Sequence, residues 1–316
     1  MDILKKAGHY ALIALKEYGI AIAFLLTCGI MTILTPVFIS PRNIFNIIRQ
    51  VSMLGIIAVG STFVILSAEI DLSVGSVVAL SGVIAAGLQV NNGMGTFLAT
   101  LIPLLISLTL GLGMGFVITK TNVHSFIVTL GMLSIARGLA LIYTGGYPIS
   151  GLNSSFNAIG GGMVGPVPIP VIIYTGVIII AYFFLSQTTF GKYIYAIGGN
   201  KEAVRLAAIP VDLYKTIVFG ISGLTSGIAG VILAARVNSG QPTAGMGWEL
   251  DVIASVIIGG TSLFGGRGGV IGTVIGSLFL GVLRNGLNLL NVSPFYQQVF
   301  IGLLIVIAVI IDKFRK

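Results

Sequence analysis

Charged residues are scarce in this chain of 316 residues, because Asp, Glu, Lys and Arg together make up only 8% of it. Soluble domains usually contain about 25% charged residues, so the composition excludes an ordinary soluble domain. Hydrophobic residues make up 56% of the chain, and its mean hydropathy is +1.07. We therefore expect the chain to lie in a lipid bilayer.

Cysteine and histidine are nearly absent, which excludes most kinds of metal site and nucleophilic catalysis. The single cysteine, Cys28, lies in an apolar segment and allows no intrachain disulfide or cysteine-based metal cluster. The two histidines, His9 and His124, have no metal-ligand spacing and do not support a Ser/His/Asp set. We expect no metal site and no catalytic residues, so we do not expect an enzyme.

Nucleotide-binding motifs are also missing. No G-x-x-x-x-G-K-[ST] sequence occurs, so the chain has no phosphate-binding loop of its own. The run G-G-R-G-G at Gly265–Gly269 lies between apolar segments and is expected to form a turn. We expect this chain to bind no cofactor, so any energy from ATP enters through a partner.

Long apolar runs dominate the rest of the sequence. A membrane-spanning helix needs about 20 apolar residues, and this length predicts an all-α, polytopic membrane protein with about ten transmembrane helices. The eighth predicted run is shorter than a full span. The approximate ranges are 19–39, 50–68, 72–90, 96–118, 125–143, 168–186, 213–235, 250–264, 269–290 and 295–311.

Most of the seventeen Lys and Arg residues fall on one side of this topology. With a cytoplasmic N-terminus, the outside positions are only Arg42, Arg49 and Arg236. Because positive loops mark the cytoplasmic side, both termini are expected to be cytoplasmic. The net charge of +8 then needs no nucleic-acid partner. The inside positions are Lys5, Lys6, Lys16, Lys120, Lys192, Lys201, Arg205, Lys215, Arg267, Lys313, Arg315 and Lys316.

Glycines four residues apart occur in three of the expected spans. Each pair lies on one face of its helix and lets a neighbouring backbone approach closely. We therefore expect a tightly packed bundle. The pairs are Gly111/Gly115, Gly223/Gly227 and Gly272/Gly276.

The stretch Gln187–Lys215 is the one long, charged interruption after the N-terminal region. It is expected to form a short helix over residues 201–209, between two spans. Such a helix fits either an amphipathic segment resting on lipid or a docking site for a partner. The local signals are a break at Gly198-Gly199, a helix cap at Asn200, a stop at Pro210 and a second cap at Asp212.

The nine acidic residues include two Glu-x-Asp pairs, Glu69/Asp71 and Glu249/Asp251. Each pair follows a break and opens a span that is rich in small residues. A carboxylate in the first turn of a helix faces the positive end of its dipole, so capping is one interpretation. The other is a polar lining of a substrate path, or a hinge at a helix break. The two pairs stand at opposite ends of the topology, as an inverted repeat would place them.

Arg137 and Arg284 each lie six residues before the outer end of an expected span. A guanidinium at the centre of a spanning helix costs roughly 2.5–3.5 kcal/mol. Snorkelling to the interface or bonding to a neighbouring helix is therefore favoured over contact with a substrate, which stays as the alternative.

Five blocks of the chain, taken together, carry a resemblance to a known family. They are EIDLSVGSVVALSG (69–82), SFIVTLGMLSIARGLALIYTGG (125–146), FGKYIYAIGGNKEAVRLAAI (190–209), SGQPTAGMGWELDVIASVIIGGTSLFGGRGGVIGT (239–273) and RNGLNLLNVSPFYQQVFIGLLIVIAVIID (284–312). In this order, over about residues 40–312, they resemble the ribose-type ABC sugar permeases. One departure is Ala68-Glu69, where such permeases commonly have Gly-Gly.

The resemblance implies the transmembrane subunit of a bacterial inner-membrane importer, with residues 1–316 forming a single permease domain. It also implies three partners: a cytoplasmic ATPase that binds ATP and Mg, a periplasmic sugar-binding protein, and a second permease copy or paralogue. The outer loops Thr144–Val167 and Val237–Trp248 are expected to receive the binding protein. Residues 187–215 become a cytoplasmic coupling loop, whose ATPase-coupling residues are Gly199, Asn200, Lys201, Glu202, Ala203, Val204, Arg205, Leu206 and Ala207.

The substrate path of such a permease is expected to carry a monosaccharide past polar and aromatic side chains. Nucleoside, autoinducer-type and branched-chain amino acid permeases of the same broad superfamily stay open as alternatives. A proton-coupled secondary transporter that titrates an acidic residue of the path also stays open, whereas an intramembrane enzyme is disfavoured. The candidate path residues are Glu69, Asp71, Phe126, Arg137, Asn238, Gln241, Thr243, Trp248, Glu249, Asp251 and Arg284.

Overall fold

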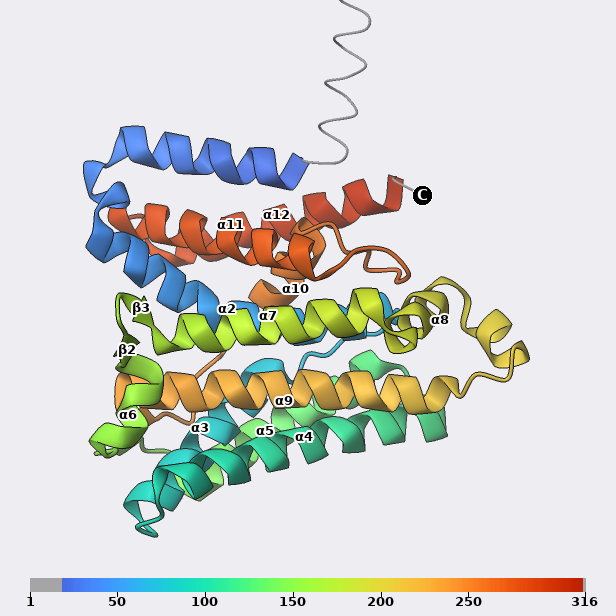
Figure 1. Cartoon of the computed structure of the whole chain (residues 1–316), viewed down its shortest axis with the longest axis horizontal. Helices are drawn as coiled ribbons and strands as arrows, with labels where there is room; N and C mark the ends of the chain where they lie inside the picture. The colour runs from blue at the N-terminus through green and yellow to red at the C-terminus, as the bar shows by residue number, and fades with distance from the viewer. Residues whose placement is uncertain (1–18, 315–316) are drawn as a thin grey trace, which may run out of the picture.

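The computed structural model describes residues 19–314 as a bundle of helices that run mostly along one direction (Figure 1). The protein is therefore an all-α, polytopic membrane protein, as its composition predicts. Five of the charged residues assigned to the cytoplasmic side, Lys5, Lys6, Lys16, Arg315 and Lys316, lie outside the described residues. The helices are Gly19–Leu34, η1 (Pro36–Ile39), α2 (Pro41–Leu66), α3 (Val74–Val90), α4 (Thr96–Thr121), α5 (Ser125–Thr144), α6 (Ser154–Gly161), α7 (Ile169–Gln187), α8 (Thr189–Leu206), α9 (Val211–Val237), α10 (Trp248–Ile258), α11 (Val270–Leu289) and α12 (Pro294–Phe314).

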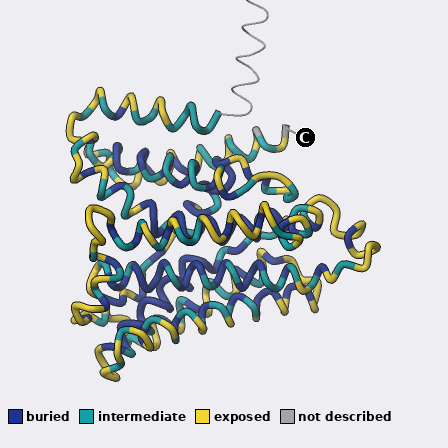
Figure 2. Tube along the Cα trace, viewed as in Figure 1, coloured by how far each residue is buried: buried dark blue, intermediate teal, exposed yellow. Residues whose placement is uncertain are grey.

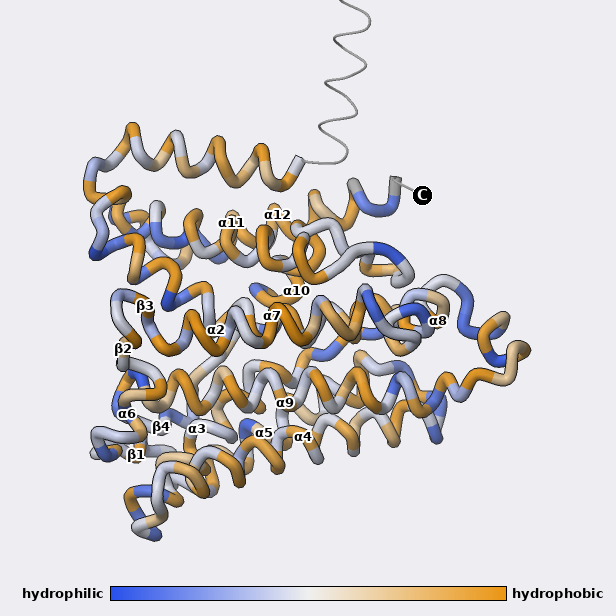
Figure 3. The backbone as a smooth tube through the Cα atoms, in the orientation of Figure 1, coloured by the Kyte–Doolittle hydropathy of each residue, from blue (hydrophilic) through white to orange (hydrophobic). Residues whose placement is uncertain are grey.

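The bundle has two ends, which we call the α6 end and the α8 end after the short elements found there (Figure 1). At the α6 end, β1 (Ile149–Ser150) pairs antiparallel with β4 (Ser239–Gly240), and β2 (Met163–Val164) pairs antiparallel with β3 (Val167–Pro168). Hydrophilic residues gather mainly at the two ends and in α8, whereas the shafts of the helices are mostly hydrophobic (Figure 3). This distribution is the one expected of helices that cross a bilayer.

Within residues 19–314, six helices are long and apolar enough to cross a bilayer: α2, α4, α5, α7, α9 and α11. Their positions agree with the predicted runs, apart from the start of α2. Ser40 caps α2 by accepting a hydrogen bond from the Asn43 backbone N–H, and Pro41 suits the first helical turn. The helix therefore begins at Pro41 instead of residue 50, because its polar first turns weaken the hydropathy signal there.

The predicted eighth run differs more strongly from the structure. Its helix, α10, has only 11 residues and rises about 16 Å, roughly half of the ~30 Å hydrocarbon thickness. Gly259 ends the helix, and Gly260 has a φ of +90°, so residues 259–264 form a turn. The other half of this passage through the bundle is non-helical chain, in which residues 242–247 form turns.

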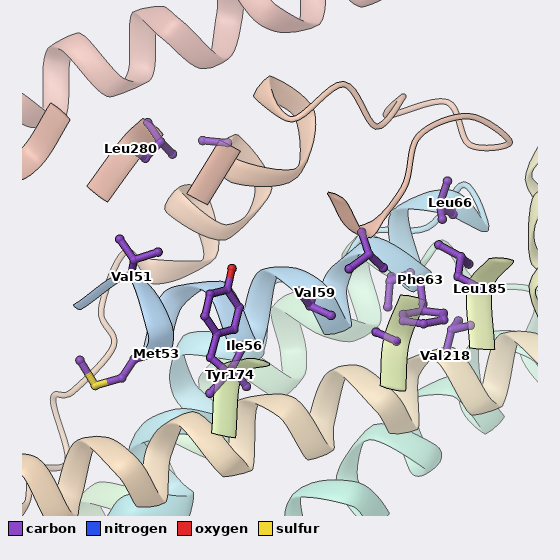
Figure 4. Packing of buried hydrophobic residues seen from close by; sticks show 14 of the residues in the cluster. Val51, Met53, Ile56, Val59, Phe63, Leu66, Tyr174, Leu185, Val218 and Leu280 are labelled. Carbon is purple, nitrogen blue, oxygen red and sulfur yellow. The ribbon is translucent and has the colours of Figure 1, made fainter. Parts of the chain in front are cut away.

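Helices α2 and α9 form the core, because 78% of the best apolar window of α2 and 72% of that of α9 are buried (Figure 2). Apolar side chains along α2, including Val51, Ile56 and Phe63, pack against Tyr174 of α7 and Val218 of α9 (Figure 4). Most of the surrounding helices therefore have one inner face on α2 or α9 and one outer face for lipid, whereas α5 packs on α3 and α4, and α12 packs on α10 and α11.

The three predicted glycine pairs all lie at close helix contacts. Gly111 lies against the Phe219 carbonyl of α9, and Gly223 lies against the Ser107 carbonyl of α4. Gly276 lies in the same way against the Ser255 carbonyl of α10. A Cβ at any of these positions would overlap a backbone oxygen, so the close approach of the backbones depends on glycine.

We predict that Gly111→Val lowers the thermal unfolding midpoint of the detergent-solubilised protein, because overpacking costs about 1–3 kcal/mol. Gly113→Val on the same helix is the matched control, since nothing lies within 4 Å of a Cβ at Gly113. Size-exclusion chromatography after heating measures both variants. An equal effect of the two substitutions would contradict the packing that we describe for α4 and α9.

Candidate functional site

Two non-helical segments, called the extended segments below although residues 242–247 of the second form turns, interrupt the helices inside the bundle. One is the segment 67–73 between α2 and α3, and the other is the segment 238–247 between α9 and α10. They meet where Gly75, in the first turn of α3, lies against the carbonyl of Gly245, just before α10. From this point α3 runs toward the α6 end and α10 toward the α8 end (Figure 1). The N-terminal ends of two short helices therefore meet inside the protein from opposite directions.

The second extended segment lies within the bundle, so the prediction that Val237–Trp248 forms an outer loop is wrong for most of its length. Gly240 contacts Val83 and Ala86 of α3, whereas Gly245 contacts Gly75. The contact point moves along α3 from Val83 to Gly75, a distance of about 12 Å at 1.5 Å per residue. From Gly240 to Gly245 the chain therefore runs beside α3, from the α6 end toward the interior of the bundle.

Arg137 of α5 holds this extended segment in place. Its guanidinium donates hydrogen bonds to the carbonyl oxygens of Pro242 at 2.6 Å and Ala244 at 2.8 Å. A third, longer bond of 3.4 Å goes to the carbonyl of Gly75 in α3. Glu249 lies close enough to attract the same guanidinium. One side chain therefore joins α5, α3 and the start of α10, as the prediction of a bond to neighbouring segments requires.

Asp71 organises the first break. Its carboxylate accepts hydrogen bonds from the Ser73 backbone N–H at 2.9 Å and from the Ser73 hydroxyl at 2.6 Å. Its other oxygen accepts from the Ser222 hydroxyl of α9 at 2.7 Å. The capping interpretation is wrong for Asp71, because Ser73 is the N-cap residue of α3 and the first turn of α3 contains no acidic residue; Asp71 instead fixes the segment just before the helix. The bond to Ser222 also fixes α3 to the core helix α9.

Asp251 has a different role from its counterpart Asp71, since its partner is a side chain of another helix. Arg284 of α11 donates to the Asp251 carboxylate at 2.5 Å. This pair joins α10 to α11 and confirms an interhelical bond for the second intramembrane arginine. Both arginines therefore serve contacts between helices in this structure.

Glu69 forms an ion pair with Lys215 of α9, and both side chains are largely buried. The preceding residue, Ala68, has a φ of +61°, a left-handed conformation that favours glycine. A glycine at position 68 would therefore also fit this backbone, and Glu69 supplies the ion pair. The pair joins the first break to the start of α9.

The α8 end contains the predicted coupling segment. Asn200 has φ −157° and ψ 94°, which kinks α8, and its side chain accepts from the N–H groups of Glu202 and Ala203 at 3.1 Å. Asn200 is therefore a helix cap, as predicted. The predicted break at Gly198-Gly199 is wrong by one residue, because both glycines are helical and the break is at Asn200 itself.

The short helix after the kink ends at Leu206, three residues before the predicted end at Ile209, and Ala208 adopts the left-handed conformation before Pro210. The predicted cap at Asp212 is wrong, because α9 already begins at Val211. Asp212 instead accepts from the Arg205 guanidinium at 3.2 Å. This bond ties the coupling segment to the first turn of α9.

The glycines of α8 contact both interrupted passages. Gly198 lies against the Leu66 carbonyl at the end of α2 and against the Gly266 backbone. The Gly266 N–H donates to the Leu66 carbonyl at 2.9 Å. Tyr195 of α8 donates to the Gly268 carbonyl at 2.8 Å, and burial raises the pKa of its hydroxyl. The G-G-R-G-G run is thus a turn, as predicted, and it packs on α8.

The structure does not bring all predicted path residues together. Gln241 and Thr243 are exposed on the extended segment, and Trp248 packs into the core. Asn238 lies at the α6 end, where it accepts from Asn157 at 3.0 Å. Phe126 opens α5 near the first break, far along the bundle from Asn238.

A small cavity of 90 Å³ lies between α3, α9 and Gln241. Ligand sites usually measure about 300–1,000 Å³, so this cavity is too small to hold a drug-sized molecule.

Some contributors to the site had no signal in the sequence. Ser73 and Ser222 are ordinary small residues there, and the acceptors of Arg137 are backbone carbonyls, which a sequence pattern does not mark. In the sequence, Lys215 is identifiable only as a positive charge expected on the cytoplasmic side. The carboxylates and arginines were detectable because ionisable residues are rare inside membrane spans.

Comparison with known proteins identifies the kind of protein that carries this arrangement. Residues 43–309 match the family described as "Branched-chain amino acid transport system / permease component". The chain belongs to this permease family. The permease is a transport protein and is not itself an enzyme. No solved structure matches it.

The permease is also similar over nearly its full length to several characterised relatives. It is 46% identical to the ribose import permease protein of Haemophilus influenzae, over 93% of this chain and 92% of the relative. It is 45% identical to the ribose import permease protein of Bacillus subtilis, over 95% and 93%. It is 40% identical to the D-allose transport system permease protein of Escherichia coli, over 98% and 95%.

We predict that Arg137→Gln lowers the thermal unfolding midpoint of the permease by several degrees, because each lost hydrogen bond to a charged group costs about 1.5–3 kcal/mol. Arg137→Lys should recover only part of the loss, since an ammonium is a point charge without the planar fork of a guanidinium. Arg42→Gln, at an exposed position of the α6 end, is the control. An unchanged midpoint for Arg137→Gln would show that the extended segment does not depend on this arginine.

Proposed function

We propose that this permease is the membrane subunit of an ABC importer for ribose or a closely related simple sugar. The observation that carries the proposal is the 46% identity to a ribose import permease over 93% of this chain. The D-allose and L-arabinose transport permeases are each 40% identical to this chain. Both relatives support a simple sugar as the class of substrate. The family description mentions branched-chain amino acids, but the sugar permeases match almost the whole chain.

The proposed orientation places the α8 end in the cytoplasm of a bacterial inner membrane, with about ten passages through the bilayer. Lys192, Lys201 and Arg205 lie on α8, and Lys313 lies near the end of α12. The α6 end has fewer cations and carries Arg42 and Arg236. The positive-inside rule then supports a cytoplasmic α8 end. Gly19 and Asp312 line one cavity. The first and last parts of the described chain therefore lie together on this side of the bundle.

The coupling segment Gly199–Ala207 is proposed to dock on a partner ATPase, which alone binds ATP and Mg. Leu206 is 90% exposed at its tip, and an apolar side chain in that position suits burial by a partner. Through Gly198, the same element lies against Leu66 and Gly266. A movement of α8 is therefore transmitted directly to Leu66, at the end of α2, and to Gly266, in the turn after α10.

The substrate path is proposed to run beside the point where α3 and α10 meet. In this assignment, Gln241 and Thr243 contact the sugar, since they are exposed and a sugar is recognised by hydrogen bonds. Arg137 and Asp71 act as positioning residues, because their polar atoms are engaged by the backbone and by neighbouring side chains. Exposure of the path on the side of one chain suits a channel completed by a second copy or a paralogue.

Phe126 and Asn238 lie at opposite ends of this path and are kept as entry and exit contacts. A periplasmic sugar-binding protein is proposed to deliver the substrate at the α6 end. Its docking surface is α6 and the β2–β3 pair, which lie at that end in Figure 1. Alternating access then follows from tilting of the short helices about the two extended segments.

A proton-coupled secondary transporter remains the second candidate, since Glu69, Asp71, Glu249 and Asp251 all lie inside the bundle. Against it, Glu69 and Asp251 are already paired with Lys215 and Arg284. Asp71 also accepts hydrogen bonds from Ser73 and Ser222, so three of the four carboxylates are already engaged in contacts within the bundle.

We predict that uptake of labelled ribose by proteoliposomes containing the permease, its ATPase and its binding protein requires ATP and survives a protonophore. Uptake that follows the proton gradient without ATP would support the secondary transporter instead. Calorimetry of the binding protein with pentoses, hexoses, nucleosides and branched-chain amino acids identifies the substrate. Binding of a branched-chain amino acid alone would overturn the sugar assignment.

We predict that Ala203→Pro abolishes transport and the stimulation of the ATPase by the permease, because proline inside a helix costs about 3 kcal/mol. Thr189→Pro is the matched control, since it occupies the first position of α8 after the Thr188 cap, where proline is tolerated, and lies outside the coupling segment. Charge reversal in Arg205→Glu should have a similar effect by breaking the bond to Asp212. Membrane insertion should be normal in all variants, and unchanged ATPase stimulation in Ala203→Pro would refute the docking site.

A further inference from the structure

An apolar groove of 450 Å³ runs along the side of the bundle between α7 and α9, with α2 as its floor. Figure 1 shows α7 and α9 beside one another with α2 behind them. Val59 and Phe63 of α2 are buried at the floor, and Ile180 of α7 forms part of an exposed wall. The groove is therefore open toward the surroundings of the bundle along one side.

The lining of the groove offers almost no hydrogen-bonding groups to a polar ligand. Of its lining residues only Thr225 has a polar side chain. The Thr225 hydroxyl donates to the carbonyls of Ile221 and Ser222 within α9, each at 3.0 Å. A molecule that fills this groove is therefore a hydrocarbon over most of its length, because an unpaired polar group would lose its hydrogen bonds to water there.

The length of the groove corresponds to one leaflet of a bilayer. On α9 its lining extends from Ile217 to Ile228, which is about 16 Å along the helix axis. The hydrocarbon core is ~30 Å thick, so one leaflet contributes about half of this. The groove begins at Phe190, near the α8 end, and stops near the middle of the bundle.

The mouth of the groove at the α8 end has the side chains of a membrane interface. Phe190 packs on Tyr214 with ring centroids 5.7 Å apart, and Tyr214 packs on Tyr193 at 5.2 Å. Tyrosine is enriched where hydrocarbon meets the headgroups. Lys192 precedes Tyr193 in α8 and is exposed at the same end of the bundle. A cation at this level attracts the phosphate of an anionic lipid.

We propose that the groove binds one anionic phospholipid of the leaflet at the α8 end, with an acyl chain between α7 and α9 and its phosphate beside Lys192. A helix of a second copy fits less well, because a spanning helix is about 10 Å wide and crosses both leaflets, whereas the groove ends halfway. The proposal requires only that the chain lies in a bilayer. It does not depend on which solute the permease carries.

Native mass spectrometry of the full-length permease in mild detergent, with phosphatidylglycerol and phosphatidylcholine added in equal amounts, tests the proposal. The unchanged chain should retain about one phosphatidylglycerol per copy after gentle activation. Leu224→Trp narrows the groove from the α9 wall and should reduce retention at least several-fold. Ile179→Trp is the matched control, since Ile179 is 62% exposed on α7 but does not line the groove. Lys192→Gln should remove the preference for phosphatidylglycerol without abolishing binding.

Two results would overturn the proposal. One is equal lipid retention by Leu224→Trp and Ile179→Trp, which would mean that the lipid is held elsewhere. The other is efficient disulfide crosslinking between two copies that carry Leu224→Cys and Cys28→Ser in native membranes, which would mean that a second copy occupies the groove. An unchanged preference for phosphatidylglycerol in Lys192→Gln would overturn the headgroup assignment. Lys192→Gln keeps the test valid if the tryptophan variant does not fold, because Lys192 is exposed and outside the core.

Discussion

Satisfaction of backbone hydrogen bonds inside the bundle is the constraint on which the rest of this structure depends. Two extended segments place peptide groups where lipid and packed helices offer no water, and an unsatisfied group there costs several kcal/mol. Arg137 supplies donors to Pro242 and Ala244, and Asp71 supplies an acceptor to Ser73. Ser125 accepts from the Ile70 N–H at 3.2 Å. The rare ionisable residues of the interior are therefore explained first by the backbone that they complete.

The same arrangement places two non-helical segments between the closely packed long helices and the short helices. The long helices α2 and α9 are packed closely through small residues such as Gly60 and Thr225, and each leads through an extended segment to a short helix. The short helices meet at Gly75 and Gly245 but run in opposite directions. Because α8 contacts Leu66 and Gly266, one element at the end of the bundle adjoins both passages. This geometry suits a proposed cycle in which an external ATPase tilts the short helices while the core stays packed.

The hydrocarbon that surrounds the bundle also determines which side chains lie at its surface. Most helices bury one face on α2 or α9 and leave the other face to hydrocarbon, which explains the large apolar side chains at the surface. Where α7 and α9 separate over α2, the surface becomes a groove with the length of one leaflet. Lipid bound there would contact α2, α7 and α9 at once, and so would belong to the packing of the core and not only to the surroundings.

The sequence by itself determined the class, the helical runs, the close glycine contacts and the cap at Asn200. Each of these follows from composition or from residues a few positions apart, where local chemistry decides the outcome. Only the tertiary structure decided that residues 238–247 enter the bundle, that Arg137 binds their carbonyls and that Glu69 pairs with Lys215. Those partners are distant in sequence, and several are backbone groups that carry no residue-specific signal. A polar, nearly uncharged segment looks the same in sequence whether water or an arginine satisfies its peptide groups, and only the packing of α3, α5 and α9 around it determines which one does.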